Sequence, residues 1–151
     1  MIANTGLEVI FAALMAAFTA QFLKLMFYYL YNKKLNFKIL TETGGMPSSH
    51  SAFVIALSTS VAIVNGYMSV EFAVATGYAL VVMYDAAGLR RSAGKMAAVL
   101  NKIVEDMYYK KEDRHASDRL IELLGHTPVE VLMGALLGVV IALAYHAALI
   151  R

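Results

Sequence analysis

The chain has 151 residues, of which 60% are hydrophobic, with a mean hydropathy of +0.62 and a formal net charge of +2. Soluble domains use roughly 45–50% apolar residues, so this composition indicates one membrane-embedded domain over residues 1–151, with the membrane and not nucleic acid as a partner. Cysteine is absent, which excludes disulfides, thiolate metal ligands and a cysteine nucleophile.

Four apolar runs, at about 7–30, 51–64, 70–84 and 129–150, predict four membrane helices. The outer two reach the roughly 20 residues that a crossing needs, whereas the middle two are short unless their flanking turns are counted. No basic segment precedes the first run, so we expect this helix to be retained and not cleaved as a signal peptide.

A further helix is predicted over 89–107, where apolar residues recur at helical spacing with charged residues largely on the other side. We expect it to lie along the cytoplasmic interface or to pack against the bundle. The predicted fold class is therefore all-α: an integral membrane helical bundle of about four transmembrane helices plus one amphipathic cytoplasmic-side helix.

Basic residues gather between the first and second spans and between the third and fourth. With four crossings, both loops lie on one side, and the positive-inside rule places them in the cytoplasm. We expect a plasma membrane of bacterial type, with the polar motifs of both loops facing the cytoplasm. The basic residues are Lys33, Lys34, Lys38, Arg90, Arg91, Lys95, Lys102, Lys110, Lys111, Arg114 and Arg119.

Polar residues interrupt the end of the first span. Gln21 and Lys24 lie one helical turn apart and share a face. Lys24 either extends to the nearby interface or points inward to meet a phosphate, and the sequence leaves both alternatives open.

A histidine stands at the start of the second span. Gly44 and Gly45 break the chain, and Pro47 followed by two serines is typical of a helix start. Capping explains the serines but not His50, which is placed where free backbone N–H groups and the helix dipole favour a phosphate.

A second histidine precedes the last span. Thr127, Pro128 and Glu130 form a capping-box pattern, in which Glu130 reaches back to a backbone N–H. Capping by itself does not account for His126, directly outside the box. Two histidines at two helix starts suggest phosphoryl chemistry at a membrane.

The third span ends in Asp85, followed by Arg90 and Arg91 within about two helical turns. A local ion pair of little energetic value is the alternative to a functional role. His115, in a charged loop, and His146, near the end of the last helix, have no neighbours that suggest a site, and no function is expected of them.

Taken together, these segments resemble the type-2 phosphatidic acid phosphatase superfamily, which includes the vanadium-dependent haloperoxidases. Residues 47–50 resemble its Pro-Ser-Gly-His element, and residues 126–134 resemble its last element, a histidine followed four residues later by a carboxylate. With residues 84–88 added, the run is similar to the divergent branch of small membrane proteins, over nearly the whole chain.

The resemblance implies a reaction that needs no metal and no cofactor. His126 would be the nucleophile, Glu130 would orient it, and His50 would protonate the leaving oxygen. The resemblance assigns Ser48 and the Ser49 backbone N–H to the phosphate. Arg90 and Arg91 in the Asp85 segment are our expected substitutes for the family's own phosphate-binding cations, with Lys24 as a supporting cation.

Three departures from the superfamily pattern stand in the sequence. Its first element, a lysine followed seven residues later by Arg-Pro, is absent, since Tyr31 follows Lys24 at that distance. Its Ser-Arg before the last histidine is missing, with Arg119 one place away from the arginine position. Glu130 replaces the usual aspartate.

The implied function is a membrane lipid phosphatase that hydrolyses a phosphomonoester or pyrophosphate through a phosphohistidine at the cytoplasmic face. Phosphatidate, phosphatidylglycerophosphate and polyprenyl phosphates all remain candidate substrates, and the oligomeric state is open. The alternative is a non-catalytic lipid-headgroup binding or scaffold protein, whereas a vanadate-using oxidase is disfavoured in such a short membrane chain.

Overall fold

The computed structural model describes residues 5–33, 45–108 and 126–149. This part of the chain is entirely helical, and each helix predicted from the sequence is present, with ends within a few residues of those expected. The all-α class is therefore confirmed. The helices are α1 (Gly6–Asn32), α2 (Ser49–Asn65), α3 (Val70–Ala87), α4 (Leu89–Tyr108) and α5 (Pro128–Leu149).

Among the described residues, three helical stretches are long and apolar enough to cross a membrane: α1, α5, and a run that begins with α3 at Val70 and continues to Val104. The remaining apolar helix, α2, has 17 residues. At about 1.5 Å per residue it is only slightly shorter than the roughly 30 Å hydrocarbon core. The chain is thus a helical membrane protein.

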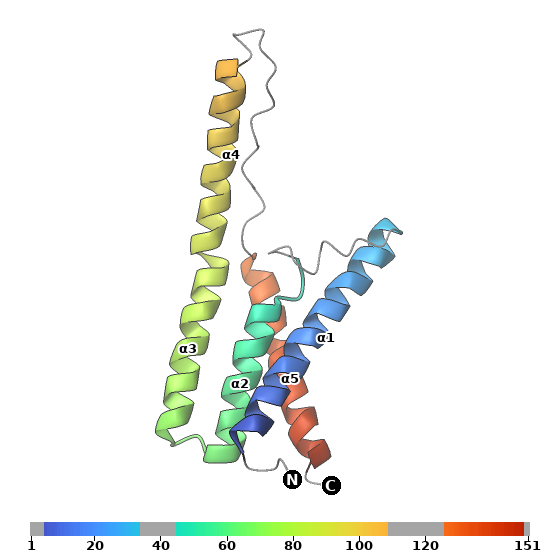
Figure 1. Ribbon diagram of the computed structural model, residues 1–151, viewed down its shortest axis with the longest axis vertical. Helices are drawn as coiled ribbons and strands as arrows, with labels where there is room; N and C mark the ends of the chain where they lie inside the picture. Colours follow the sequence, from blue (N-terminus) through green and yellow to red (C-terminus); the bar gives the residue numbers. More distant parts are fainter. Residues whose placement is uncertain (1–4, 34–44, 109–125, 150–151) are drawn as a thin grey trace.

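α2 lies at the centre of the bundle and contacts α1, α3 and α5, while α1 also packs against α5 (Figure 1). Small residues make this position possible. Where these helices meet, the fully buried residues of the core cluster are alanines, against which Leu137 and Ile141 pack. The alanines are Ala16, Ala20, Ala52, Ala56 and Ala142. Close approach of helix backbones through small side chains is typical of membrane proteins, because lipid offers no hydrophobic force to drive helices together.

Two glycines set the distance between α2 and α5. A Cβ atom on Gly138 would lie 2.5 Å from the Ala52 carbonyl oxygen, and one on Gly134 would lie even closer to the Ser48 carbonyl oxygen. Any larger residue would therefore push the helices apart. This contact fixes the first turn of α2, which contains His50, against the start of α5, which follows directly after His126 and Thr127.

A buried polar pair closes the opposite end of the bundle. The His146 Nδ1 atom on α5 lies 2.6 Å from the Glu8 Oε1 atom on α1, and both side chains are almost wholly buried. The sequence analysis gave His146 no role and did not single out Glu8. The structure shows that this pair joins the first and last helices.

The amphipathic helix α4 continues from α3 and extends beyond the bundle (Figure 1). The Ser92 N–H donates to the Gly88 carbonyl, and the Gly88 N–H donates to the Tyr84 carbonyl, so helical hydrogen bonding passes through the junction. Among the described helices α4 contacts only α3. The amphipathic helix is confirmed, and within the described residues its packing against the bundle is limited to α3.

Candidate active site

The first turn of α5 places a carboxylate beside a histidine. The Glu130 Oε2 atom accepts a hydrogen bond from the Thr127 N–H at 3.0 Å, and the Thr127 hydroxyl accepts one from the Glu130 N–H at 3.3 Å. The same Oε2 atom lies 3.1 Å from the Nδ1 atom of His126. One carboxylate oxygen of Glu130 therefore takes part both in the capping box and in the contact with His126.

This contact determines which nitrogen of His126 is available for chemistry. An ionised carboxylate only accepts hydrogen bonds, so it favours the tautomer with the proton on Nδ1. The Nε2 atom then carries the lone pair. The His126 side chain is almost fully buried, whereas Glu130 is about one-fifth exposed.

Backbone hydrogen bonds bring three distant segments to this point. The His126 N–H donates to the Ala86 carbonyl at the end of α3, at 3.0 Å, and the Ser48 N–H donates to the Glu130 carbonyl at 3.1 Å. Asp85, half-buried, is next to Ala86 in the chain and so lies near His126.

His50 lies close to His126. It is the second residue of α2 and is exposed, and its ring centroid is 6.2 Å from that of His126, with the ring planes at 63°. At this distance both imidazoles can contact one anion of the size of phosphate. The two histidines predicted to act together are thus neighbours, although 75 residues separate them in the sequence.

The two serines before His50 have different surroundings. Ser48 is fully buried, and its hydroxyl accepts hydrogen bonds from the Ser51 N–H at 3.3 Å and from the Ser51 hydroxyl at 3.1 Å, so it serves as the N-cap of α2. Ser49 is also buried but lines a groove next to His50. The Ser49 side chain thus lies nearer to the candidate site's open side than that of Ser48.

Lys24 points inward. Only 6% of its surface is exposed, and a Cβ atom on Gly45 would lie 3.5 Å from both Cγ and Cδ of Lys24. Gly45 has φ +83°, a left-handed conformation that glycine adopts without strain, so the loop before α2 runs close along the lysine stem. Of the two directions considered for Lys24, the structure has the inward one, and its contact with a phosphate stays a prediction.

The remaining predicted residues are only partly described. Arg90 and Arg91 belong to the first turn of α4, shortly after Asp85, but their side chains lie outside the described part, as does the whole of His115. Within residues 5–33, 45–108 and 126–149, no group of three or more His, Asp or Glu side chains is placed to hold a metal ion.

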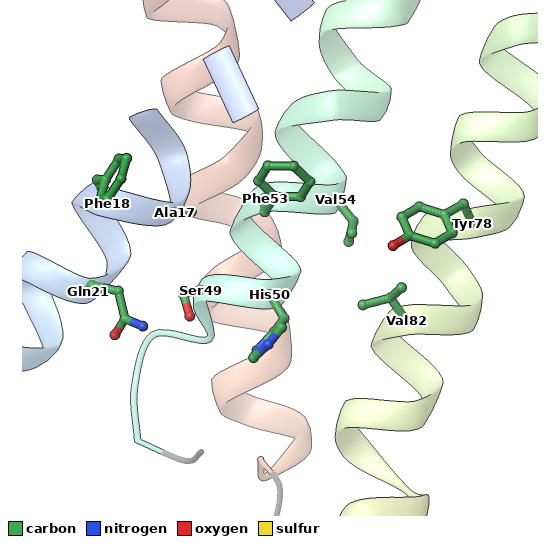
Figure 2. A pocket seen from close by; sticks show the side chains of 9 residues that line it. All are labelled: Ala17, Phe18, Gln21, Ser49, His50, Phe53, Val54, Tyr78 and Val82. Atoms are coloured by element: carbon green, nitrogen blue, oxygen red, sulfur yellow. The ribbon is translucent and has the colours of Figure 1, made fainter. Parts of the chain in front are cut away.

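A groove of about 340 Å³ opens beside His50, between α1, α2 and α3 (Figure 2). Sequence analysis did not identify it, because its walls come from helices that no local motif connects. The only available signal was the spacing of Tyr78 and Val82, which lie one turn apart on α3.

The helical membrane fold agrees with what sequence comparison finds. The chain belongs to the Divergent PAP2 family, whose model matches residues 5–141. It is 42% identical over 141 residues to YuiD of Bacillus subtilis (strain 168), described as an uncharacterized membrane protein, and the match covers 87% of this chain and 89% of YuiD. No solved structure matches the chain. The family resemblance read from the motifs is confirmed.

Proposed function

We propose that this protein is a metal-independent membrane lipid phosphatase that acts through a phosphohistidine intermediate at the cytoplasmic face. The observation that carries the proposal is the His126–Glu130 contact at 3.1 Å, with the His50 ring centroid 6.2 Å from that of His126. A nucleophile, its orienting carboxylate and a second titratable ring form the arrangement that phosphoryl transfer to histidine requires.

The reaction proceeds in two steps. In the first, the His126 Nε2 lone pair attacks phosphorus, the ester P–O bond breaks, and protonated His50 gives its proton to the leaving lipid oxygen. In the second, neutral His50 takes a proton from water as the water oxygen attacks phosphorus, the P–N bond breaks with its electron pair returning to the His126 Nε2 atom, and phosphate leaves. Glu130 stabilises the positive charge that the His126 ring carries while it is phosphorylated.

Positive groups compensate the charge of the transferred phosphoryl group. Lys24 is directed inward beside the loop before α2, and the first turns of α2 and α5 present backbone N–H groups at the positive ends of two helix dipoles. Arg90 and Arg91 are the further cations that the sequence places near Asp85.

The alternative is a protein that binds lipid headgroups without turnover. The missing first element of the superfamily and the capping role of the Ser48 hydroxyl favour it. Glu130 argues against it, because a carboxylate beside an anion site weakens anion binding by charge repulsion. The capping of α5 explains the contact with the Thr127 N–H, but the contact with the His126 ring is useful chiefly if the imidazole becomes positively charged, as in catalysis.

Phosphate release from purified protein tests the proposal. Incubated with phosphatidate, phosphatidylglycerophosphate or a polyprenyl phosphate, the wild type should release phosphate, orthovanadate should inhibit, and EDTA should have no effect. His126→Ala should release none, while His115→Ala should match the wild type. Loss of activity in EDTA with recovery on adding a divalent ion would contradict the mechanism, and binding without any release would support the alternative.

A further inference from the structure

The groove beside His50 exists because α1 and α3 both pack on α2 but, over the described residues, do not contact each other. The surface of α2 between them forms the floor, with Phe53 and Val54 one turn beyond His50 (Figure 2). The walls are Phe18 on α1 and Tyr78 on α3, both more than half exposed in the bundle. Since these helices are membrane helices, the groove opens sideways to lipid.

Apart from the Tyr78 hydroxyl, which points into the groove (Figure 2), the lining of the groove is polar at one end only. Gln21, Ser49 and His50 lie together at the end near His126, and the other lining residues, Ala17, Phe18, Phe53, Val54, Tyr78 and Val82, are apolar or aromatic. A ligand that fills this groove and reaches the candidate site must therefore be apolar along its length and polar at its end.

We infer that the groove holds one hydrocarbon chain of the substrate, which enters sideways from the bilayer between α1 and α3. This inference rests on the proposed function for the identity of the polar end, a phosphate between His50 and His126. The ligand class is a phosphate joined to a long chain, either isoprenoid or acyl.

The contribution of the groove is position and not affinity. Bilayer lipid is as apolar as the groove lining, so a chain gains little by leaving one for the other. A chain lying along α2, however, holds the attached phosphate in reach of both histidines, and such positioning acts on turnover. A substrate without a chain should be insensitive to the groove.

Ala17 permits a direct test, because its side chain lines the groove and a larger residue there would fill it. We expect Ala17→Phe to lower phosphate release from a chain-bearing lipid by about tenfold or more while leaving para-nitrophenyl phosphate hydrolysis unchanged. The matched control is Ala144→Phe, on an exposed position of α5, which should leave both reactions unchanged.

The choice of lipid separates the two chain classes. A loss with polyprenyl phosphate alone assigns the groove to an isoprenoid chain, and a loss with phosphatidate alone assigns it to an acyl chain. If Ala17→Phe hydrolyses both lipids like the wild type, or lowers the lipid and soluble reactions equally, the inference is wrong.

A photolabelling experiment keeps this inference separable from the proposed function. A lipid phosphate with a diazirine near the phosphate end of its chain should label Phe53 and Tyr78 in the wild type and in His126→Ala, but not in Ala17→Phe. Such labelling without phosphate release from any substrate would contradict the proposed phosphatase function but would still support a hydrocarbon chain in the groove. Labelling spread evenly over the lipid-facing helices would contradict the inference that the groove holds a chain, whether or not the protein releases phosphate.

Discussion

At the scale of single residues, one oxygen atom of Glu130 serves two partners, the Thr127 N–H and the Nδ1 atom of His126. The first contact stabilises the start of α5, and the second holds the imidazole ring. A loss of activity after replacing Glu130 could therefore come from a frayed helix or from a misoriented histidine. Two substitutions separate these causes.

Glu130→Gln should keep the cap, because the amide oxygen can still accept from the Thr127 N–H, but should remove the negative charge beside His126. We expect the unfolding temperature to change little and phosphate release to fall by about 10²-fold or more. Thr127→Ala should remove the hydroxyl that accepts from the Glu130 N–H but keep the carboxylate beside His126. We expect it to lower stability by about 1 kcal/mol and to retain most of the activity. Equal activity losses in the two variants would show that the box matters only for folding.

At the scale of helices, the α2–α5 contact decides whether the site forms. Ser48 is at the same time the N-cap of α2, a hydrogen-bond donor to the Glu130 carbonyl, and the residue that Gly134 packs against. Spreading the two helices would therefore also move His50 away from His126.

Gly134→Ala and Gly138→Ala should each destabilise the protein by about 2 kcal/mol or more and lower phosphate release, because the new methyl group meets backbone carbonyl atoms that cannot move independently. Gly77→Ala on α3 is the matched control. Nothing lies within 4 Å of a Cβ atom there, so it should be neutral or stabilising by up to about 1 kcal/mol. Thermal unfolding in detergent measures the stability of these variants and of the control. An unchanged melting temperature of Gly134→Ala would contradict the close contact between Gly134 and the Ser48 carbonyl.

At the scale of the whole molecule, polar groups lie at both ends of an alanine-lined interface. The His126–Glu130 pair is at one end, and the Glu8–His146 pair is at the other. Breaking a buried pair leaves one polar group without compensation, which is far more costly than losing a surface pair.

Glu8→Ala or His146→Ala should accordingly lower the free energy of unfolding by about 3–5 kcal/mol, whereas the double change Glu8→Leu with His146→Leu should recover much of this loss. The exposed Glu71 provides the control, since Glu71→Ala should cost less than about 1 kcal/mol. Additive losses in the double variant, measured by denaturant unfolding, would refute an interaction between the two residues.

The orientation of the molecule can be tested because the chain contains no cysteine. Single cysteines at Thr43 and Ser117 should react only with reagents that reach the cytoplasm, and one at the exposed Met68 should react from outside, as the distribution of basic residues requires. Labelling of the cysteine at position 43 from outside in intact cells would show that the orientation is the opposite one, with His50 and His126 at the outer face.

The helices and their starts were predictable from the sequence because their causes are local. Long apolar runs indicate membrane helices, and the box from Thr127 to Glu130 forms within one turn, as the pattern indicates. The resemblance also singled out His50, His126 and Glu130, which lie close together in the structure, while their roles stay a prediction. Lys24, by contrast, could not be assigned a direction from its own segment.

Only the tertiary structure decided which distant residues meet. Glu8 and His146 stand near opposite ends of the chain, and neither has a local motif, so their contact depends on the packing of α1 against α5. The groove beside His50 depends in the same way on tertiary packing, because it forms where α1 and α3 both pack against α2. Periodicity shows that a helix has a buried face but not which helix covers it, because small residues such as Gly134 and Ala142 permit close contact with any partner of matching shape.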